Sequence, residues 1–367
     1  MDKKKQMNFN LNNFLLSLSS ALDEVESREF NTSRYHSKRV AFLSLKFALE
    51  FNYSQEALFD ICAYSLIHDI ELSLEQETKE FLKKLPFAFE EQKDVLKHYD
   101  NYNEAPLFSQ FISFSNLIDR KFDLSDDCIE NREKILNFVK SNENKLFSSD
   151  LVECFEEFAL NTNFWLDLKN ENELLTFIFS TLHDKTIVLN FEEILDISSF
   201  FTKITNKDLK IIEYASKVAD FYNFEHKEKQ TFLIAASLCN IGKLYINEKI
   251  LEKKTSLTCT EYELVKAYPY YTKKILSNIL GFSDICSYAY KIKEQIDAKG
   301  YPFGLEAKDL SLKDRSLALV NIYTALRSDK VHRKAYNKEE AFDILEQMTK
   351  ENRVDETIVN DFKEIFK

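Results

Sequence analysis

Glycine and proline are scarce in this chain of 367 residues, which contains only four of each. Average proteins use about 7% glycine and about 5% proline, so this chain has few residues that end helices or form tight β-turns. Apolar side chains recur at helical spacing, for example at Val40, Leu43 and Phe47. These features predict an all-α fold, and the length suffices for two or three domains with cores of their own.

The chain has a formal net charge of −12. It lacks the broad positive field that a general nucleic-acid or anionic-membrane binder needs, so any anion site must be local. No apolar run reaches the roughly 18 residues of a membrane-spanning helix, and the first residues lack the features of a signal peptide. Six scattered cysteines without a CxxC pair are typical of a reducing compartment. We therefore expect a soluble, cytoplasmic protein without membrane insertion.

The sequence repeats itself weakly at a spacing of 171 residues. Each copy has the pattern of a helix, a polar break and a second helix that ends in a polar pair followed by isoleucine. The two copies superpose without a gap, which places His36 on Lys207 and His68-Asp69 on Cys239-Asn240. We predict two related helical domains at 1–125 and 191–367, joined by a helical connector at 126–190.

The first copy contains a metal-type arrangement. His36 on one helix and the pair His68-Asp69 at the end of the next can converge on one divalent ion such as Mn, Fe or Mg. Such an ion generates hydroxide from bound water and polarises phosphoryl oxygens. His98 is a further candidate ligand, and Asp119 is another. The alternative interpretation is that these are buried polar residues, satisfied by their neighbours and left from an ancestral site.

The C-terminal part carries several motifs in a characteristic order. Gly300-Tyr301-Pro302 resembles the GYP segment of the HD-GYP family, which comprises helical, metal-dependent phosphodiesterases of cyclic di-GMP within the HD superfamily. The resemblance runs from about Ile197 to Phe366 and also includes the stretches Ala236–Lys243, Asn247–Lys254, Tyr268–Thr272 and Ala325–Lys334. It implies tandem HD-type domains, because residues from about 31 to 123 resemble the HD-like domain that precedes some HD-GYP domains. In that first domain, Asn116 stands where the superfamily has its final aspartate.

The resemblance implies that the second domain has lost its metal ligands. At the positions where the family carries them, this chain has Lys207, Cys239, Asn240, Tyr268, Ile292, Lys293 and Asn321. Lysine and isoleucine side chains do not ligate a divalent cation, and ammonium groups repel one. We therefore expect a degenerate HD-GYP domain that holds no metal and has no hydrolytic activity.

The groups that face phosphate in the family are retained. The resemblance places Lys243, Lys330 and Arg333 on the phosphates of a cyclic dinucleotide, and Gly300 and Tyr301 on the loop that shapes the pocket. Lysine and arginine hold phosphate without a metal, and Lys293 adds positive charge. The alternative interpretation is that the basic side chains lie on solvated helix ends and that Gly300 only serves a turn.

Three hypotheses follow from the sequence. The first is a catalytically inactive HD-GYP-like signalling protein that works as a binding or scaffolding module and binds cyclic di-GMP. The second is a metal-dependent phosphohydrolase or phosphodiesterase that is active at the N-terminal site. The third is a helical scaffold whose two pockets are vestigial and which binds a protein partner or forms a homodimer.

Overall fold

The computed structural model describes residues 6–30, 32–68, 84–85, 104–182, 187–206, 209–331 and 333–367. Its regular structure is helical apart from one short sheet, in which β1 (Gln6–Phe9) pairs with β2 (Ile187–Asn190). The predicted all-α fold is therefore confirmed. None of the described helices is long and apolar enough to cross a bilayer.

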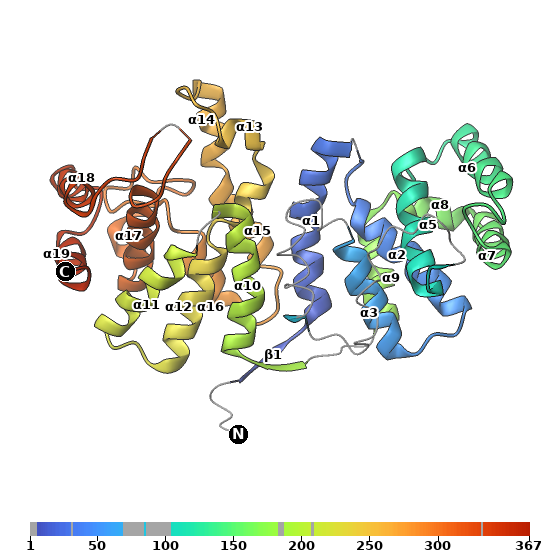
Figure 1. The fold of residues 1–367 in the computed structure, drawn as a ribbon, viewed down its shortest axis with the longest axis horizontal. Helices are drawn as coiled ribbons and strands as arrows, with labels where there is room; N and C mark the ends of the chain where they lie inside the picture. Colours follow the sequence, from blue (N-terminus) through green and yellow to red (C-terminus); the bar gives the residue numbers. More distant parts are fainter. Residues whose placement is uncertain are drawn as a thin grey trace. The chain divides into compact units, whose positions relative to one another are not determined.

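The chain divides into two compact units. The N-terminal unit comprises residues 10–187, and the C-terminal unit comprises residues 188–367 together with the segment that contains β1. Figure 1 shows the helices of each unit coloured along the chain.

The N-terminal unit is built around α2 (His36–Glu50), whose side chains are buried on nearly all sides. It packs against α3 (Gln55–Leu66) and α5 (Leu107–Phe122), and α1 (Leu11–Phe30) packs against α2 and α3. Phe47 of α2 contributes to an aromatic core in which its ring lies 5.1 Å from Phe114 and 5.7 Å from Phe111, measured between ring centres. This core fixes the first half of α5 beside the last turn of α2.

Residues 126–190 were expected to form a connector, but the helices described there pack within the N-terminal unit. These helices are α6 (Ile129–Ser141), α7 (Ser149–Ala159), α8 (Thr162–Leu168) and α9 (Glu171–Thr181). Helices α7 and α9 contact α2, and α6 contacts α5. The reason is apolar burial, since Phe155, Phe164 and Trp165 are almost fully buried.

The C-terminal unit is arranged around α12 (His226–Leu238), which contacts α10 (Phe191–Asn206), α11 (Lys210–Phe221), α16 (Ser283–Ala289) and α17 (Leu312–Leu326) (Figure 1). A 3₁₀ helix, η5 (Ile241–Tyr245), follows α12 and packs on α15 (Tyr268–Leu276). The remaining elements are α13 (Glu248–Leu251), α14 (Cys259–Lys266), η6 (Ala307–Asp309), α18 (Lys338–Lys350) and α19 (Glu356–Ile365).

The two units contain the same helical hairpin at the spacing that the sequence predicts. Helices α2 and α3 correspond to α11 and α12, and the break between them contains Asn52 in one unit and Asn223 in the other. Both asparagines have left-handed backbones, with φ values of 55° and 52°. In both, the residue after the asparagine donates its backbone N–H to an alanine carbonyl five residues earlier, over 3.0 Å. Asparagine tolerates this conformation better than most residues, which explains why both copies carry it.

Candidate functional site

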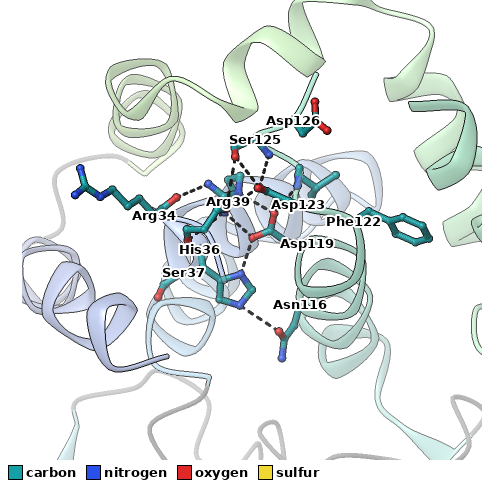
Figure 2. A network of polar contacts seen from close by, with 12 residues as sticks. Arg34, His36, Ser37, Arg39, Asn116, Asp119, Phe122, Asp123, Ser125 and Asp126 are labelled. Atoms are coloured by element: carbon teal, nitrogen blue, oxygen red, sulfur yellow. Dashed lines mark hydrogen bonds and ion pairs between the residues drawn. The ribbon is translucent and has the colours of Figure 1, made fainter. Parts of the chain in front are cut away.

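The predicted N-terminal site lies where α2 begins beside the last turn and a half of α5. His36 is fully buried and extends its ring to Asn116 and Asp119 (Figure 2). Its Nδ1 lies 2.5 Å from Asp119 Oδ2, and its Nε2 lies 3.2 Å from Asn116 Oδ1. Both ring nitrogens therefore already contact oxygen atoms, so a metal could bind Nε2 only if the contact with Asn116 were broken.

Asp119 forms a buried ion pair. Arg39 holds its carboxylate with two hydrogen bonds, of 2.8 Å from Nε and 2.9 Å from Nη2, and the backbone N–H of Leu124 donates a third over 2.8 Å. Burial alone would raise the pKa of Asp119, but Arg39 and His36 outweigh burial and lower that pKa below its usual range. The carboxylate is committed to Arg39, which favours a structural role over the metal-ligand role considered from the sequence.

His68 lies beside His36, with 5.2 Å between the two ring centres. Its Nδ1 is 2.7 Å from the carbonyl oxygen of Ser65. A carbonyl only accepts, so Nδ1 carries the proton, and in the neutral ring Nε2 then carries the lone pair. This arrangement is the one that orients histidine ligands of metals.

The fit of the N-terminal residues to a divalent metal is partial. Asp69 and His98, the other predicted ligands, lie outside the described residues. Within the described residues, no group of three or more His, Cys, Asp or Glu side chains is arranged to hold a metal. His68 has the orientation of a ligand, and His36 has its nitrogens directed at other partners.

In the C-terminal unit, three of the residues that the resemblance places at metal-ligand positions lie together, namely Cys239, Asn240 and Asn321. Asn240, two residues beyond the end of α12, donates from Nδ2 to Oδ1 of Asn321 on α17 over 3.2 Å. The same Nδ2 lies 3.4 Å from Sγ of Cys239. Burial raises the pKa of the Cys239 thiol to about 12, so the thiol is neutral near pH 7. Two amides and a neutral thiol provide no anionic ligand for a cation.

Two lysines interact electrostatically with Cys239, the residue before Asn240. Burial lowers the pKa of Lys243 to about 7, helped by repulsion from Lys293 and Lys330 and opposed by Cys239. Burial also lowers the pKa of Lys293, with Cys239 opposing this effect and Lys330 adding to it. The amines of Lys243 and Lys293 thus both lie close enough to Cys239 to interact with it. Lys207, aligned with a further ligand position, lies outside the described residues.

Tyr268 lies below Lys243, whose amine is 5.5 Å from the centre of the tyrosine ring. The side chain is 2% exposed, and among the described residues its hydroxyl has no hydrogen-bond partner. Burial raises the pKa of Tyr268 well above its usual value, with Tyr301 and Cys239 adding to the effect. The hydroxyl is therefore protonated and can donate a hydrogen bond.

The Gly300-Tyr301 segment folds back on the chain just before it. A side chain at Gly300 would place its Cβ 2.3 Å from the backbone nitrogen of Gln295, so only glycine fits there. The backbone N–H of Tyr301 donates to the carbonyl of Lys293 over 3.1 Å. The buried carboxylate of Glu294 accepts from the backbone N–H groups of Phe303 and Leu305, both over 2.9 Å. The segment therefore holds Lys293 in place. Ile292, at another ligand position of the family, is fully buried.

Arg333 is oriented toward the end of α17. Its guanidinium donates to the carbonyls of Ala325 over 2.6 Å, Leu326 over 3.2 Å and Lys334 over 3.0 Å, and it stacks on Tyr336. These bonds satisfy carbonyls that a helix end leaves open. They favour a structural role for Arg333 over the phosphate contact that the family resemblance implies.

Two features of the C-terminal site were not predicted from the sequence. Glu294 was treated only as a flanking residue, although a buried acid next to a glycine-containing turn is a signal for backbone anchoring. Tyr245 and Tyr271 stack with their ring centres 4.3 Å apart, near Lys243 and Tyr268 in the sequence. Their pairing depends on how η5 packs against α15, which no local pattern indicates.

Comparisons with known proteins agree with this architecture. Residues 190–358, which lie in the C-terminal unit, match the HD domain family. This match and the relatives below confirm the HD-type resemblance predicted from the sequence. Over 96% of its length the chain is 21% identical to the 3'3'-cGAMP-specific phosphodiesterase 1 of Vibrio cholerae, of which it spans 91%.

A second relative matches more closely over a shorter segment. The cyclic di-GMP phosphodiesterase PdeB of Borreliella burgdorferi is 37% identical over 102 residues, which are 28% of this chain and 27% of that protein. The crystal structure of the cyclic GMP-AMP specific phosphodiesterase V-cGAP3 of Vibrio cholerae superposes with a TM-score of 0.69 at 18% identity and covers 98% of both chains. This similarity shows a shared fold.

Proposed function

We propose that the chain is a signalling protein whose C-terminal HD domain binds a cyclic dinucleotide and does not hydrolyse it. Relatives that are named for the hydrolysis of cyclic di-GMP or 3'3'-cGAMP support the ligand class. The loss of anionic ligands supports the absence of hydrolysis, because enzymes of this type use metal-bound water as the nucleophile. We place the protein in the cytoplasm, where such ligands occur.

The observation that carries the proposal is the hydrogen bond between Asn240 and Asn321. Two carboxylates at this separation repel each other unless a cation lies between them. Two amides instead complement each other, as donor and acceptor, so the buried site is stable without an ion. With asparagine at both positions, the site has no carboxylate ligands for a metal and no carboxylate repulsion that a metal would relieve.

The residues that remain can bind a phosphodiester. Lys243 and Lys330 supply positive charge, and the Tyr301 segment positions Lys293. Ammonium groups make charge-assisted hydrogen bonds to phosphate oxygens. With no anionic ligand at Cys239, Asn240 or Asn321 to hold a metal and generate hydroxide, binding proceeds without cleavage.

Titration of the purified full-length protein with cyclic di-GMP and with 3'3'-cGAMP tests this proposal. We expect saturable binding in EDTA, no nucleotide product by chromatography after prolonged incubation with Mn²⁺, and weaker binding by Lys243→Met. The matched control is Lys308→Met, because the Lys308 side chain is 74% exposed. Absence of binding to both ligands would refute the ligand class, and metal-dependent product formation that persists in His68→Ala would refute the inactivity of the C-terminal domain.

A second candidate function is metal-dependent phosphohydrolysis at the N-terminal site. It is favoured by the proximity of His36 and His68 and by the carbonyl that orients His68. His68, with Asp69 and His98, would hold a Mn, Fe or Mg ion that activates water. Elemental analysis together with a phosphodiesterase assay tests it. A stoichiometric metal and activity that are both lost in His68→Ala would support this function, and a metal-free protein without activity would exclude it.

A protein partner or a homodimer stays a prediction from the sequence. In a signalling protein without catalytic activity, ligand binding has to change an interaction with another protein, which is the functional reason to expect a partner. Measurement of the molecular mass in solution with and without cyclic di-GMP would detect a ligand-dependent homodimer.

A further inference from the structure

Three segments of the C-terminal unit surround one small cavity. The first is residues 291–296, which precede the Gly300-Tyr301 turn, the second is the start of α17, and the third is the loop between α18 and α19. The volume of the cavity is about 20 Å³. Its lining includes three cationic and three anionic side chains, which are Lys291, Arg315, Arg353, Glu294, Asp314 and Asp355. These charges cancel, so the lining favours a neutral occupant over an ion.

Hydrogen bonds and ion pairs join each of the three segments to the other two. The amine of Lys291 lies 3.0 Å from Oδ2 of Asp314 and joins residues 291–296 to α17. The backbone N–H of Ile296 donates to a carbonyl of the loop before α19 over 3.2 Å. Arg315 of α17 donates from Nη1 to Oδ2 of Asp355 over 2.8 Å. The walls of the cavity are therefore held in fixed positions.

Two of the side chains that line the cavity carry buried polar atoms without a partner. Oδ2 of Asp314 accepts from the Lys291 amine over 3.0 Å and from the N–H and hydroxyl of Ser311 over 2.9 and 2.8 Å. Oδ1 of the same carboxylate, on a residue that is 3% exposed, has no partner among the described residues. The same holds for Nε of Arg315. Buried donors and acceptors are rarely left unpaired.

We propose that the cavity binds one water molecule, which accepts from Nε–H of Arg315 and donates to Oδ1 of Asp314. A buried water molecule needs a cavity of roughly 10–15 Å³ and two to four polar partners. The cavity of about 20 Å³ has room for one molecule, and the two unpaired atoms supply one donor and one acceptor. The inference concerns a different site from the proposed ligand site and does not depend on which ligand the unit binds.

The chemistry of the two atoms distinguishes water from an ion. A guanidinium only donates hydrogen bonds, and a carboxylate only accepts them. An anion would pair with Arg315 but would be repelled by Oδ1 of Asp314. A metal cation would pair with Asp314 but would be repelled by Arg315. A water molecule both donates and accepts, so it satisfies both atoms at once.

The bound water adds to the contacts that hold the Gly300-Tyr301 segment. Glu294, which also lines the cavity, accepts from the backbone N–H groups of Phe303 and Leu305. The stretch that contains Lys293 and Tyr301 is therefore anchored beside the water. We expect loss of the water to loosen the contact between residues 291–296 and the loop before α19.

The first test is a high-resolution crystal structure of the full-length protein, from crystals grown in bromide and in rubidium salts. We expect one peak of electron density within about 2.7–3.2 Å of both Asp314 Oδ1 and Arg315 Nε. We expect no anomalous signal from either ion there. An empty cavity, or an anomalous peak of bromide or rubidium inside it, would overturn the proposal.

The second test follows the Nε–H proton of Arg315 by NMR in full-length protein with isotope-labelled arginine. The signal is assigned by its disappearance in Arg315→Lys. We expect a cross-peak with water whose sign in the rotating-frame spectrum is opposite to that of the diagonal. This sign identifies a water molecule that stays beside the proton, whereas proton exchange with solvent gives the same sign as the diagonal. Absence of the cross-peak would contradict the proposal.

A matched pair of variants on α17 tests what the water does. Ala318 lines the cavity and is 9% exposed, whereas Ala325 does not line it. Ala318→Val fills the room of the water, so the cross-peak should disappear, the thermal unfolding midpoint should fall, and hydrogen exchange at the Ile296 N–H should quicken. Ala325→Val makes the same change of residue in the same helix and should retain the cross-peak.

The outcomes decide both parts of the inference. A cross-peak that persists in Ala318→Val would show that the water beside Arg315 lies outside this cavity, which overturns the proposed site. A cross-peak lost in Ala318→Val, with hydrogen exchange at Ile296 no faster than in Ala325→Val, would show that the water does not join the segments. The crystal structure and the wild-type NMR spectrum decide the site even if Ala318→Val fails to fold.

Discussion

The two units contain the same helical hairpin but differ in how their buried polar groups are paired. In the N-terminal unit, Asp119 is paired with Arg39 and contacts His36, so the charges cancel within the fold. In the C-terminal unit, the amides of Asn240 and Asn321 pair with each other, and Lys293 is left without a carboxylate among its described neighbours. The first site pairs opposite charges, whereas the second pairs neutral amides.

This difference shows that the backbone of the hairpin sets where polar groups meet, whereas the side chains set the chemistry of the site. The hairpin brings polar groups from its helix ends together with a later helix, which is α5 in one unit and α17 in the other. The identities of those groups then determine whether the place stabilises the fold, binds a metal or binds an anion. A shared fold therefore does not settle function.

The largest effect is expected where the N-terminal charges are broken apart. Asp119→Ala would leave Arg39 buried without its partner, and removing one member of a buried pair costs about 3–5 kcal/mol. Denaturant unfolding should show this loss, and hydrogen exchange should place it in α2 and α5.

The matched control is an exposed ion pair in the same unit. Glu156 lies 3.4 Å from Lys140, and both side chains are well exposed. Glu156→Ala should therefore cost no more than about 1 kcal/mol. If the two variants lose similar amounts of stability, the buried pair of Arg39 and Asp119 does not stabilise the unit more than the exposed pair does.

The C-terminal lysines should make stability depend on pH. The pKa of Lys243 falls to about 7 in the folded chain, and in the unfolded chain it returns to its usual value near 10.5. Between these values the unfolded state binds more protons, so stability rises with pH, by at most about 1.4 kcal/mol per pH unit from this group. At or below about pH 7 this gain is absent.

Urea unfolding from about pH 7 to about pH 9 measures this slope. Lys243→Met should flatten it, because the titrating amine is gone, and Lys308→Met should leave it unchanged. If the unfolding free energy depends on pH equally in the wild type and in Lys243→Met, the pKa of Lys243 is not lowered by folding.

A smaller effect is expected from the close packing of η5 on α15. A Cβ on Gly242 would lie 2.0 Å from the carbonyl oxygen of Tyr268 and 2.6 Å from the nitrogen of Thr272. The helices must separate to admit it, and overpacking of this kind costs about 1–3 kcal/mol. Gly242→Ala should lower the unfolding midpoint, whereas Ser277→Ala at an exposed position of the same region should not.

The sequence sufficed for the helical class and for the repeated helical hairpin. Periodicity and the two asparagine breaks are local signals, so the hairpins could be placed without tertiary information. The pairing of Asn240 with Asn321, 81 residues apart, and of Arg39 with Asp119, 80 residues apart, depends on the packed fold. For the same reason, the packing of α6 to α9 into the N-terminal unit could not be inferred from polar breaks alone.

The smallest effect is expected from Arg333. The family resemblance implies that its side chain contacts phosphate, whereas in the structure it bonds to carbonyls at the end of α17. Its guanidinium donates to three backbone carbonyls, and a lysine has too compact a head group to reach all of them. Arg333→Lys should therefore cost about 1 kcal/mol of stability and change the affinity for cyclic di-GMP by less than about twofold. Calorimetric titration and urea unfolding of the same sample measure both. A roughly tenfold loss of affinity at unchanged stability would instead show that Arg333 contacts the ligand, as the family resemblance implies.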